Sequence, residues 1–189
     1  MKMRFFTLVM LLCLLTGCAL KKDYVEIEYK PCFTPQKIVG IENIEVAINV
    51  SDHRVKEHVG DKVWENFDIM ASNSLVEGFK NAIAWELQER GFRIGHDGYN
   101  LDIEIHKFYN HYEYGPFAAN ANSETVLNVN LRNKEGMITY SKIILGFGDE
   151  SPCFLLSGTN ARIALERSLY NTIQKLMNDP DFIWALSNS

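Results

Sequence analysis

The reactive residue with the clearest sequence context is Cys18, near the N-terminus of this 189-residue chain. Lys2 and Arg4 precede an apolar run over residues 5–15. That run suits a signal peptide but is too short for a membrane-spanning helix, which needs about 20 apolar residues. It ends in the sequence LTGC over residues 15–18, the pattern of a lipobox. The pattern predicts cleavage before Cys18 and attachment of a diacylglycerol and an acyl chain to that residue. A secretory signal with a chance cysteine, or a short membrane anchor, is the alternative.

The lipid on Cys18 predicts where the chain resides. Two acyl chains hold a protein stably on a bilayer, whereas one chain holds it weakly and reversibly. Ala19 follows the cysteine, where an Asp commonly retains enterobacterial lipoproteins in the inner membrane. We therefore expect the periplasmic face of the outer membrane, with inner-membrane or surface-exposed placement left open. We divide the chain into a signal peptide (1–17), a lipidated cysteine with a tether (18–37) and a single periplasmic α+β domain (38–189).

Two further cysteines, Cys32 and Cys153, follow the lipidation site. An oxidising compartment permits a disulfide between them. Pairing requires a Cα separation of about 4.4–6.8 Å, which a sequence does not reveal. A Cys32–Cys153 bridge and two free buried thiols therefore both remain open.

Histidines near acidic residues raise the question of a metal site. His53 and His58 have the spacing H-x₄-H, which matches no structural zinc pattern, and no cysteine pair accompanies them. His106 alternates with Asp102 and Glu104, so a solvated sheet face explains all three, and a weak metal site there is the alternative. The sequence contains no G-x-S-x-G motif and no cysteine-protease signature. We predict no catalytic residue, no metal ligand and no cofactor other than the covalent lipid.

The densest unusual patch is aromatic and lies between residues 108 and 117. Aromatic side chains supply large contact areas with few rotatable bonds, as protein interfaces require. We take the exposed members as a candidate partner-binding surface, the alternative being that half of them pack in the core. The candidates are Tyr109, Tyr112, Tyr114 and Phe117.

The charge of the chain argues against one class of partner. The net charge is −5, and loss of the basic signal peptide makes the remaining chain more acidic. An acidic surface disfavours nucleic acid, so we expect no nucleic-acid partner.

Hydrophobic periodicity places these residues on regular elements. Period-two alternation predicts strands, Ser74 with Glu77 is a capping box that begins a helix, and Gly91 is placed to end it. Residues 51–70 are interpreted as a long loop, and Gly146-Phe147-Gly148 as loop glycines. The predicted fold is α+β, with a mostly antiparallel sheet of about four strands and two long helices on one face. The predicted order is strand (44–50), helix (74–91), strands (99–106, 127–132, 137–147) and helix (159–178).

Several segments together resemble the YajG family of bacterial lipoproteins. After the lipobox, the sequence VAINVSDHR resembles the strand and D-x-R signature of that family, and three later segments continue the match over roughly residues 41–186. Those segments are 87–92, 101–105 and 179–182. The resemblance implies an outer-membrane lipoprotein without an established activity. The order of elements is also similar to LptE-like assembly lipoproteins and to the N-terminal module of TolB-like proteins, which act through protein contacts.

Two functions follow as hypotheses. The first is a non-enzymatic accessory or structural component of an envelope protein complex, such as a secretion or assembly system. Its contacts would be the lipid bilayer through Cys18 and another envelope protein through a sheet edge or the aromatic segment. The second is a periplasmic carrier or sensor of a small ligand (a lipid, glycan or metal), which requires a concave pocket.

Overall fold

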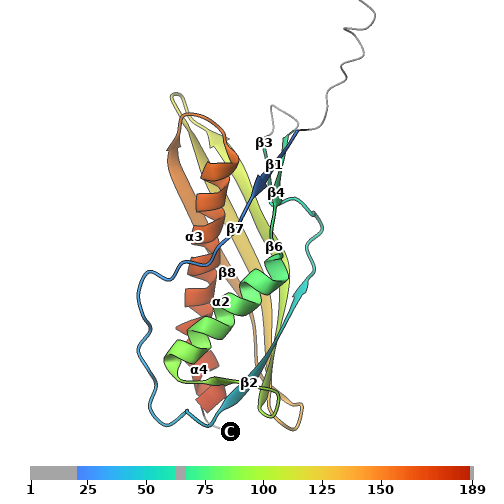
Figure 1. The fold of residues 1–189 in the computed structure, drawn as a ribbon, viewed down its shortest axis with the longest axis vertical. Coiled ribbons are helices and arrows are strands. Elements are labelled where there is room, and N and C mark those ends of the chain that lie inside the picture. Colours follow the sequence, from blue (N-terminus) through green and yellow to red (C-terminus); the bar gives the residue numbers. More distant parts are fainter. Residues whose placement is uncertain (1–20, 63–66, 188–189) are drawn as a thin grey trace, which may run out of the picture.

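The computed structural model describes residues 21–62 and 67–187 (Figure 1). The predicted signal peptide and Cys18 lie outside the described residues. The elements are the strands β1 (Lys21–Val25), β2 (Glu45–Asp52), β3 (Gly60–Lys62), β4 (Phe67–Ala71), β5 (Arg93–Ile94), β6 (Tyr99–Tyr114), β7 (Ala119–Arg132) and β8 (Ile138–Cys153), and the helices α2 (Leu75–Arg90), α3 (Gly158–Met177) and α4 (Pro180–Ser187).

The long strand β6 organises the sheet. One edge of β6 pairs antiparallel with β7, which pairs antiparallel with β8. The other edge pairs in parallel with β2, as far as Asp52 opposite Ile105, and then with β3 at Gly60 opposite Asn110. β4 and β1 extend the sheet beyond β3, and β5 pairs with β2.

The predicted sheet of about four mostly antiparallel strands with two helices is therefore wrong. Over the described ranges the sheet has eight strands and is mixed, and three helices accompany it. The crossover through α2 returns the chain parallel to β2, and alternation within a strand does not reveal strand direction. Strands β1, β3, β4 and β5 have five residues or fewer, too short for a clear alternation signal. Two of them, β3 and β4, lie in the segment that we interpreted as a loop.

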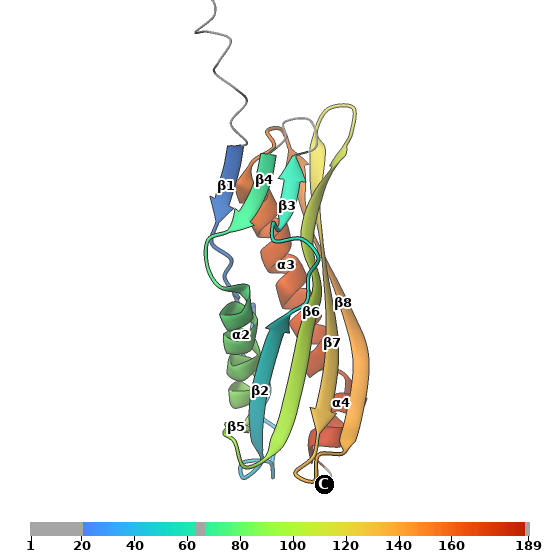
Figure 2. The ribbon, with the colours of Figure 1, turned by 90° about the vertical axis from the view of Figure 1, so that its right-hand side faces the viewer.

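Both long helices pack on the same face of the sheet (Figure 2). Helix α2 begins where the sequence predicts, because the Ser74 side chain accepts a hydrogen bond from the Glu77 N–H at 3.3 Å. Gly91 ends this helix with φ = +108°, a left-handed conformation that glycine adopts without strain. The core lies between the helices and the sheet, where Phe79 of α2 meets Phe108 of β6 edge to face at 5.4 Å.

Helix α3 approaches β8 closely because β8 carries glycine on the covered face. A Cβ built at Gly146 would lie 2.7 Å from the Thr172 backbone nitrogen and 2.8 Å from the Ser168 carbonyl oxygen. Gly148 likewise faces the backbone of α3. The interpretation of Gly146 and Gly148 as loop glycines is therefore wrong, since both lie within β8 under the helix.

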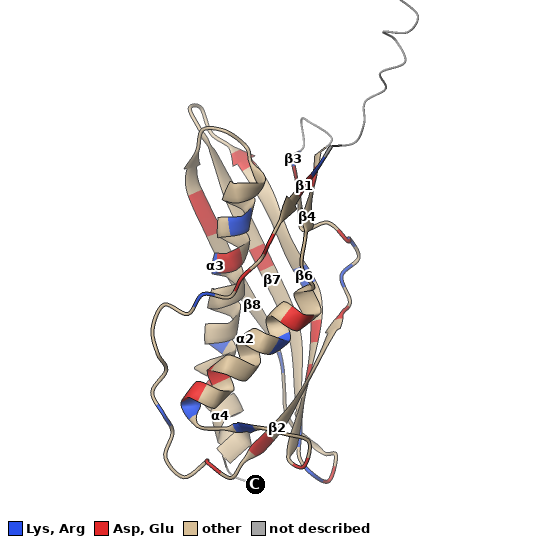
Figure 3. Cartoon of the chain, in the orientation of Figure 1, with Lys and Arg blue, Asp and Glu red and all other residues tan. Residues whose placement is uncertain are grey.

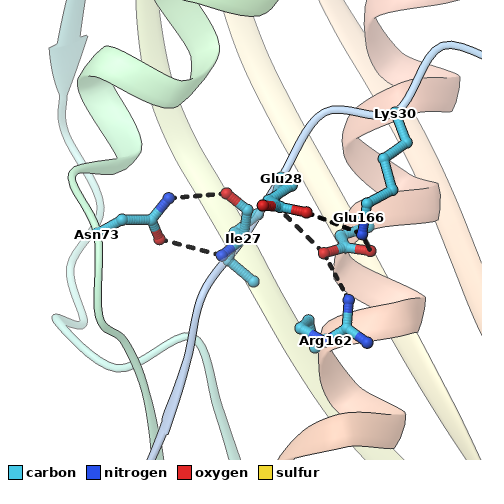
Figure 4. A network of polar contacts seen from close by, with 6 residues as sticks. All are labelled: Ile27, Glu28, Lys30, Asn73, Arg162 and Glu166. Atoms are coloured by element: carbon cyan, nitrogen blue, oxygen red, sulfur yellow. Dashed lines mark hydrogen bonds and ion pairs between the residues drawn. The ribbon is translucent and has the colours of Figure 1, made fainter.

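The segment that follows Cys18 is part of the fold from Lys21 onward, within the range that we assigned to a tether. β1 pairs with β4, and Ile27 is buried. The Asn73 side chain bonds both the N–H and the carbonyl of Ile27, at 3.0 and 2.7 Å (Figure 4). On the other side, Glu166 of α3 accepts from the Glu28 N–H at 3.3 Å. These contacts fix the segment between α2 and α3.

A buried polar network joins this segment to both helices. The Glu86 carboxylate is fully buried and accepts hydrogen bonds from the Arg90 guanidinium and the Tyr29 hydroxyl. Gln174 of α3 donates to Glu86 at 2.6 Å, and Arg90 donates to Asn178 at 3.3 Å. Burial, followed by the hydrogen bond to Glu86, raises the pKa of Tyr29 well above its usual value, so its hydroxyl stays a donor. The network ties α2, α3 and the N-terminal segment into one unit.

Candidate functional site

In the described part of the chain, no helix covers the face of β2, β6, β7 and β8 that points away from α2 and α3 (Figure 2). We call it the outer face. Alternate residues of β7 and β8 point to it, while their neighbours pack under the helices. An uncovered sheet face exposes side chains held in fixed register, so it is the natural candidate for recognition.

The centre of the outer face is polar and internally paired. Asp102 of β6 accepts from Asn49 of β2 at 3.0 Å and from Arg132 of β7 at 3.3 Å. Glu104 accepts from Asn128 at 3.1 Å and contacts His106 at 2.8 Å. The hydrogen bonds from Asn128 and then His106 hold the pKa of Glu104 below its usual value. Such cross-strand pairs stabilise the sheet and leave little unsatisfied polarity for a partner.

The β8 side of the outer face is apolar. Ile143, Leu145 and Phe147 alternate along β8 and are 61%, 40% and 58% exposed. We call these three residues the apolar row. Val126 of β7 lies opposite Leu145 in the register and extends the row toward β6. A contiguous exposed apolar surface on a folded domain is typical of a binding site.

The free edge of β8 is closed by side chains of α3. Lys175 donates to the Leu145 carbonyl at 2.8 Å and Asn171 donates to the Phe147 carbonyl at 2.8 Å. Arg167 donates to the Asp149 carbonyl. The spacing of the donors matches that of the acceptors. Side chains four residues apart on α3 are separated by about 6 Å along the helix, and carbonyls two residues apart on β8 are separated by about 6.7 Å. Strand addition at this edge would break these bonds, so the outer face rather than the edge is the part of β8 that is open to contact.

A basic pocket lies where the chain leaves the outer face between β2 and β3. The pocket has a volume of about 420 Å³. Its lining residues include Arg54, Lys56, His58, Lys107 and Tyr109. A β-bulge between Ile105 and Lys107 turns β6 at this point. Figure 3 shows charged residues of both signs on this loop and on the neighbouring strands.

Two contacts fix the basic groups of this pocket. The Arg54 guanidinium pairs with Asp52 at 2.8 Å. Burial alone would raise the pKa of Asp52, but the hydrogen bonds and charge of Arg54 outweigh it and lower that pKa. The Lys56 ammonium lies 4.7 Å from the centre of the Tyr109 ring, a cation–π distance. Lys107 likewise pairs with Glu124, so Lys56 is the basic group of the lining that is best placed to meet an anionic ligand.

Comparisons with known proteins place the chain in a family. A model of the family Lipoprotein_16, described as uncharacterized lipoprotein, matches residues 33–187. The chain belongs to this lipoprotein family. Membership supports a membrane-anchored position in the cell envelope. No curated protein matches the lipoprotein.

Solved structures share the fold of the lipoprotein at low identity. A Xanthomonas campestris protein of the DUF330 family is similar with a TM-score of 0.57 and 12% identity, covering 89% of this chain and 95% of that one. A Helicobacter pylori protein described as a neuraminyllactose-binding hemagglutinin homolog has a TM-score of 0.53 and 11% identity, covering 86% of this chain and 97% of its own. Identities this low establish the fold alone.

The predicted aromatic surface of the lipoprotein is divided between core and solvent. Tyr112 is buried, 5% exposed, and donates to the Ser157 carbonyl at 2.6 Å, so it is unavailable to a partner. Tyr109 is half-buried and donates to Asp61. Tyr114 and Phe117 are 51% and 94% exposed. These two lie at the β6–β7 turn, away from the apolar row.

Cys32 and Cys153 lie far apart and are not joined by a disulfide. Cys32 is exposed beside Tyr170, and Cys153 is buried and contacts the Glu150 carbonyl at 3.2 Å. Cys153 lies near the start of α3, whereas Tyr170 lies about 18 Å along that helix at 1.5 Å per residue. This separation far exceeds the reach of a disulfide, and both thiols are free.

The histidines that raised the question of a metal site do not all lie together. His53 and His106 stack at 5.7 Å, and His58 meets Tyr109 at 5.6 Å. Within residues 21–62 and 67–187, no group of three or more His, Cys, Asp or Glu side chains is arranged to hold a metal ion. The helices described in the structure include none that is both long and apolar enough to cross a membrane.

Sequence reasoning missed the apolar row. Its residues stand in the continuous run IILGF over 143–147, which carries no visible alternation. Gly146 is the residue that could have indicated them. A glycine within a strand is typical of close packing against a helix, and its two neighbours, Leu145 and Phe147, then point to the opposite face of the sheet.

Proposed function

We propose that this lipoprotein is a non-enzymatic accessory component of an envelope protein complex, as in a secretion or assembly system. Lipid on Cys18 holds it on the periplasmic face of the outer membrane, as the resemblance to the YajG family implies. The partner is a protein that covers the apolar row of β8. The proposal includes no catalytic step and no cofactor other than the covalent lipid.

One observation carries this proposal. Ile143, Leu145 and Phe147 are exposed side by side on the sheet. Because about half of each side chain is already covered, burying the rest would stabilise a complex by roughly 1 kcal/mol per residue. The closed edge of β8 restricts the contact to side chains on the face. Aromatic and aliphatic residues at the centre of a patch, bordered by polar residues such as Asn128, have the composition of a protein interface.

We expect the triple variant Ile143→Thr, Leu145→Thr, Phe147→Thr to lose its partner. Recovery of crosslinked envelope proteins with the affinity-purified lipoprotein should fall by about tenfold or more, since each 1.4 kcal/mol lost is a factor of ten. The fold should persist, because these residues are exposed and threonine suits a strand.

The control for this experiment changes exposed apolar residues elsewhere. Phe33→Thr with Val39→Thr removes side chains that are 61% and 92% exposed outside the sheet. Recovery should match that of the unaltered protein. Equal recovery of the same proteins by the triple variant would refute the apolar row as the contact.

The basic pocket favours a second function, a periplasmic carrier or sensor of an anionic small ligand. We expect inorganic phosphate or glycerophosphoglycerol to bind there with salt-dependent affinity. The variant Lys56→Ala, Lys107→Ala should weaken binding about tenfold, because charge-assisted contacts contribute about 1.5–3 kcal/mol. Isothermal titration calorimetry measures this, with Lys134→Ala in the β7–β8 turn as the control. Absence of binding heat for both probes would dismiss this function.

A further inference from the structure

Two loops that expose large apolar side chains lie together at one end of the lipoprotein. Phe117, 94% exposed, stands in the β6–β7 turn. Phe154 and Leu155, 78% and 82% exposed, stand in the loop between β8 and α3. The register pairs Ala119 with Cys153, so the two loops are neighbours.

The same end receives the chain from the lipidation site. β1 starts at Lys21, and Figures 1 and 2 show this start at the end of the molecule that carries both loops. The Asp23 carboxylate accepts from the Gly158 N–H at 2.8 Å, at the close of the second loop. The Tyr112 hydroxyl, from the strand before the first loop, binds the Ser157 carbonyl. β1 and both loops are therefore locked together.

The distance from Cys18 to this end is short. Two residues, Ala19 and Leu20, lie between Cys18 and Lys21. An extended chain spans at most about 3.6 Å per residue, so the three steps from Cys18 to Lys21 cover at most roughly 11 Å. The polar headgroup layer of one leaflet is about 5–8 Å thick. A domain whose sheet begins at Lys21 thus cannot stand far from the bilayer that holds the lipid. Its loop-bearing end is therefore the part of the domain held nearest the headgroups.

The chemistry of both loops suits that environment. Residues 114–123 and 151–161 contain no Asp, Glu, Lys or Arg. Phe117, Phe154 and Leu155 project from loop tips, and aromatic and aliphatic residues of this kind are enriched where proteins enter the membrane interface. Lys22 is exposed on β1 nearby, where a positive charge favours anionic headgroups.

We propose that Phe117, Phe154 and Leu155 insert into the membrane interface beside the lipid on Cys18. The ligand is the lipid surface itself. The lipoprotein then stands upright, with its long axis along the membrane normal and the β7–β8 turn farthest from the bilayer. This inference rests on the lipid anchor of the proposed function, and does not depend on the protein partner.

The test uses the full lipidated protein in vesicles of phosphatidylethanolamine and phosphatidylglycerol that contain a doxyl-labelled phospholipid. In a Cys32→Ser background, an environment-sensitive nitrobenzoxadiazole dye is attached through Phe117→Cys or Leu155→Cys. Lys134→Cys, in the exposed β7–β8 turn at the opposite end, is the matched control. Flotation of the vesicles first measures whether the protein is anchored.

The expected result is flotation of every variant, with a blue-shifted dye at positions 117 and 155. Quenching there should exceed quenching at 134 by roughly twofold or more, since inserted groups reach about 5–10 Å into the interface. Flotation with equal quenching at all three positions would overturn insertion while leaving the anchor intact. Loss of flotation would overturn the anchor on Cys18 and this inference with it.

Discussion

Replacing Glu86 by Ala lowers the free energy of unfolding of this lipoprotein by about 3–5 kcal/mol, the usual cost of breaking a buried ion pair from one side. The substitution leaves the buried Arg90 guanidinium without its carboxylate. It also removes the acceptor of Tyr29 and Gln174, which lie on the N-terminal segment and on α3. Urea unfolding followed by far-ultraviolet circular dichroism measures the effect.

The control for Glu86→Ala is Glu89→Ala, which lies in the same helix and is partly exposed. Substitutions at such surface positions change stability by about 0.5 kcal/mol or less. If Glu86→Ala and Glu89→Ala unfold at the same urea concentration, the network around Glu86 does not hold α2 and α3 together.

Replacing Gly146 by Val destabilises the lipoprotein by about 3 kcal/mol, at the upper end of the usual cost of overpacking. A side chain there overlaps Thr172 and the Ser168 carbonyl, so α3 must move away from β8. Movement of α3 also withdraws Asn171 and Lys175 from the edge carbonyls of β8. The melting temperature should fall by about 6–12 °C, given 2–4 °C per kcal/mol for a chain of this size.

The matched control for Gly146→Val is Leu145→Val, the neighbouring position on the outer face. It removes one methylene from a side chain that is 40% exposed, so we expect a melting temperature within about 2 °C of the unaltered protein, as for other surface changes. A Gly146→Val variant as stable as this control would show that α3 does not pack closely on β8.

The elements that could be predicted from the sequence have strong local signals. Ser74 and Gly91 define α2 because capping depends on residues within one turn. Alternation predicts the first part of β6, over 99–106, and the last part of β7, over 127–132, whereas the structure continues β6 to Tyr114 and begins β7 at Ala119. The parallel pairing of β2 with β6 could not be predicted, because strand direction depends on where α2 carries the chain.

The candidate site could be predicted only in part for the same reason. The bulge at His106 shifts the alternation of β6, so that Phe108 and Tyr112 point into the core while Lys107 and Tyr109 face out. No local pattern reveals such a shift. The apolar row depends likewise on α3, which covers Gly146 and thereby leaves Leu145 on the outer face.

On the proposed function, the apolar row of β8 contacts an envelope protein. The most direct test incorporates a photoreactive phenylalanine analogue at Leu145 of the lipidated protein in living cells, with Gln88 on the exposed side of α2 as the comparison position. We expect a discrete crosslinked band from position 145 after irradiation and none from position 88. The same bands from both positions, or none from position 145 in protein shown to reach the envelope, would contradict it.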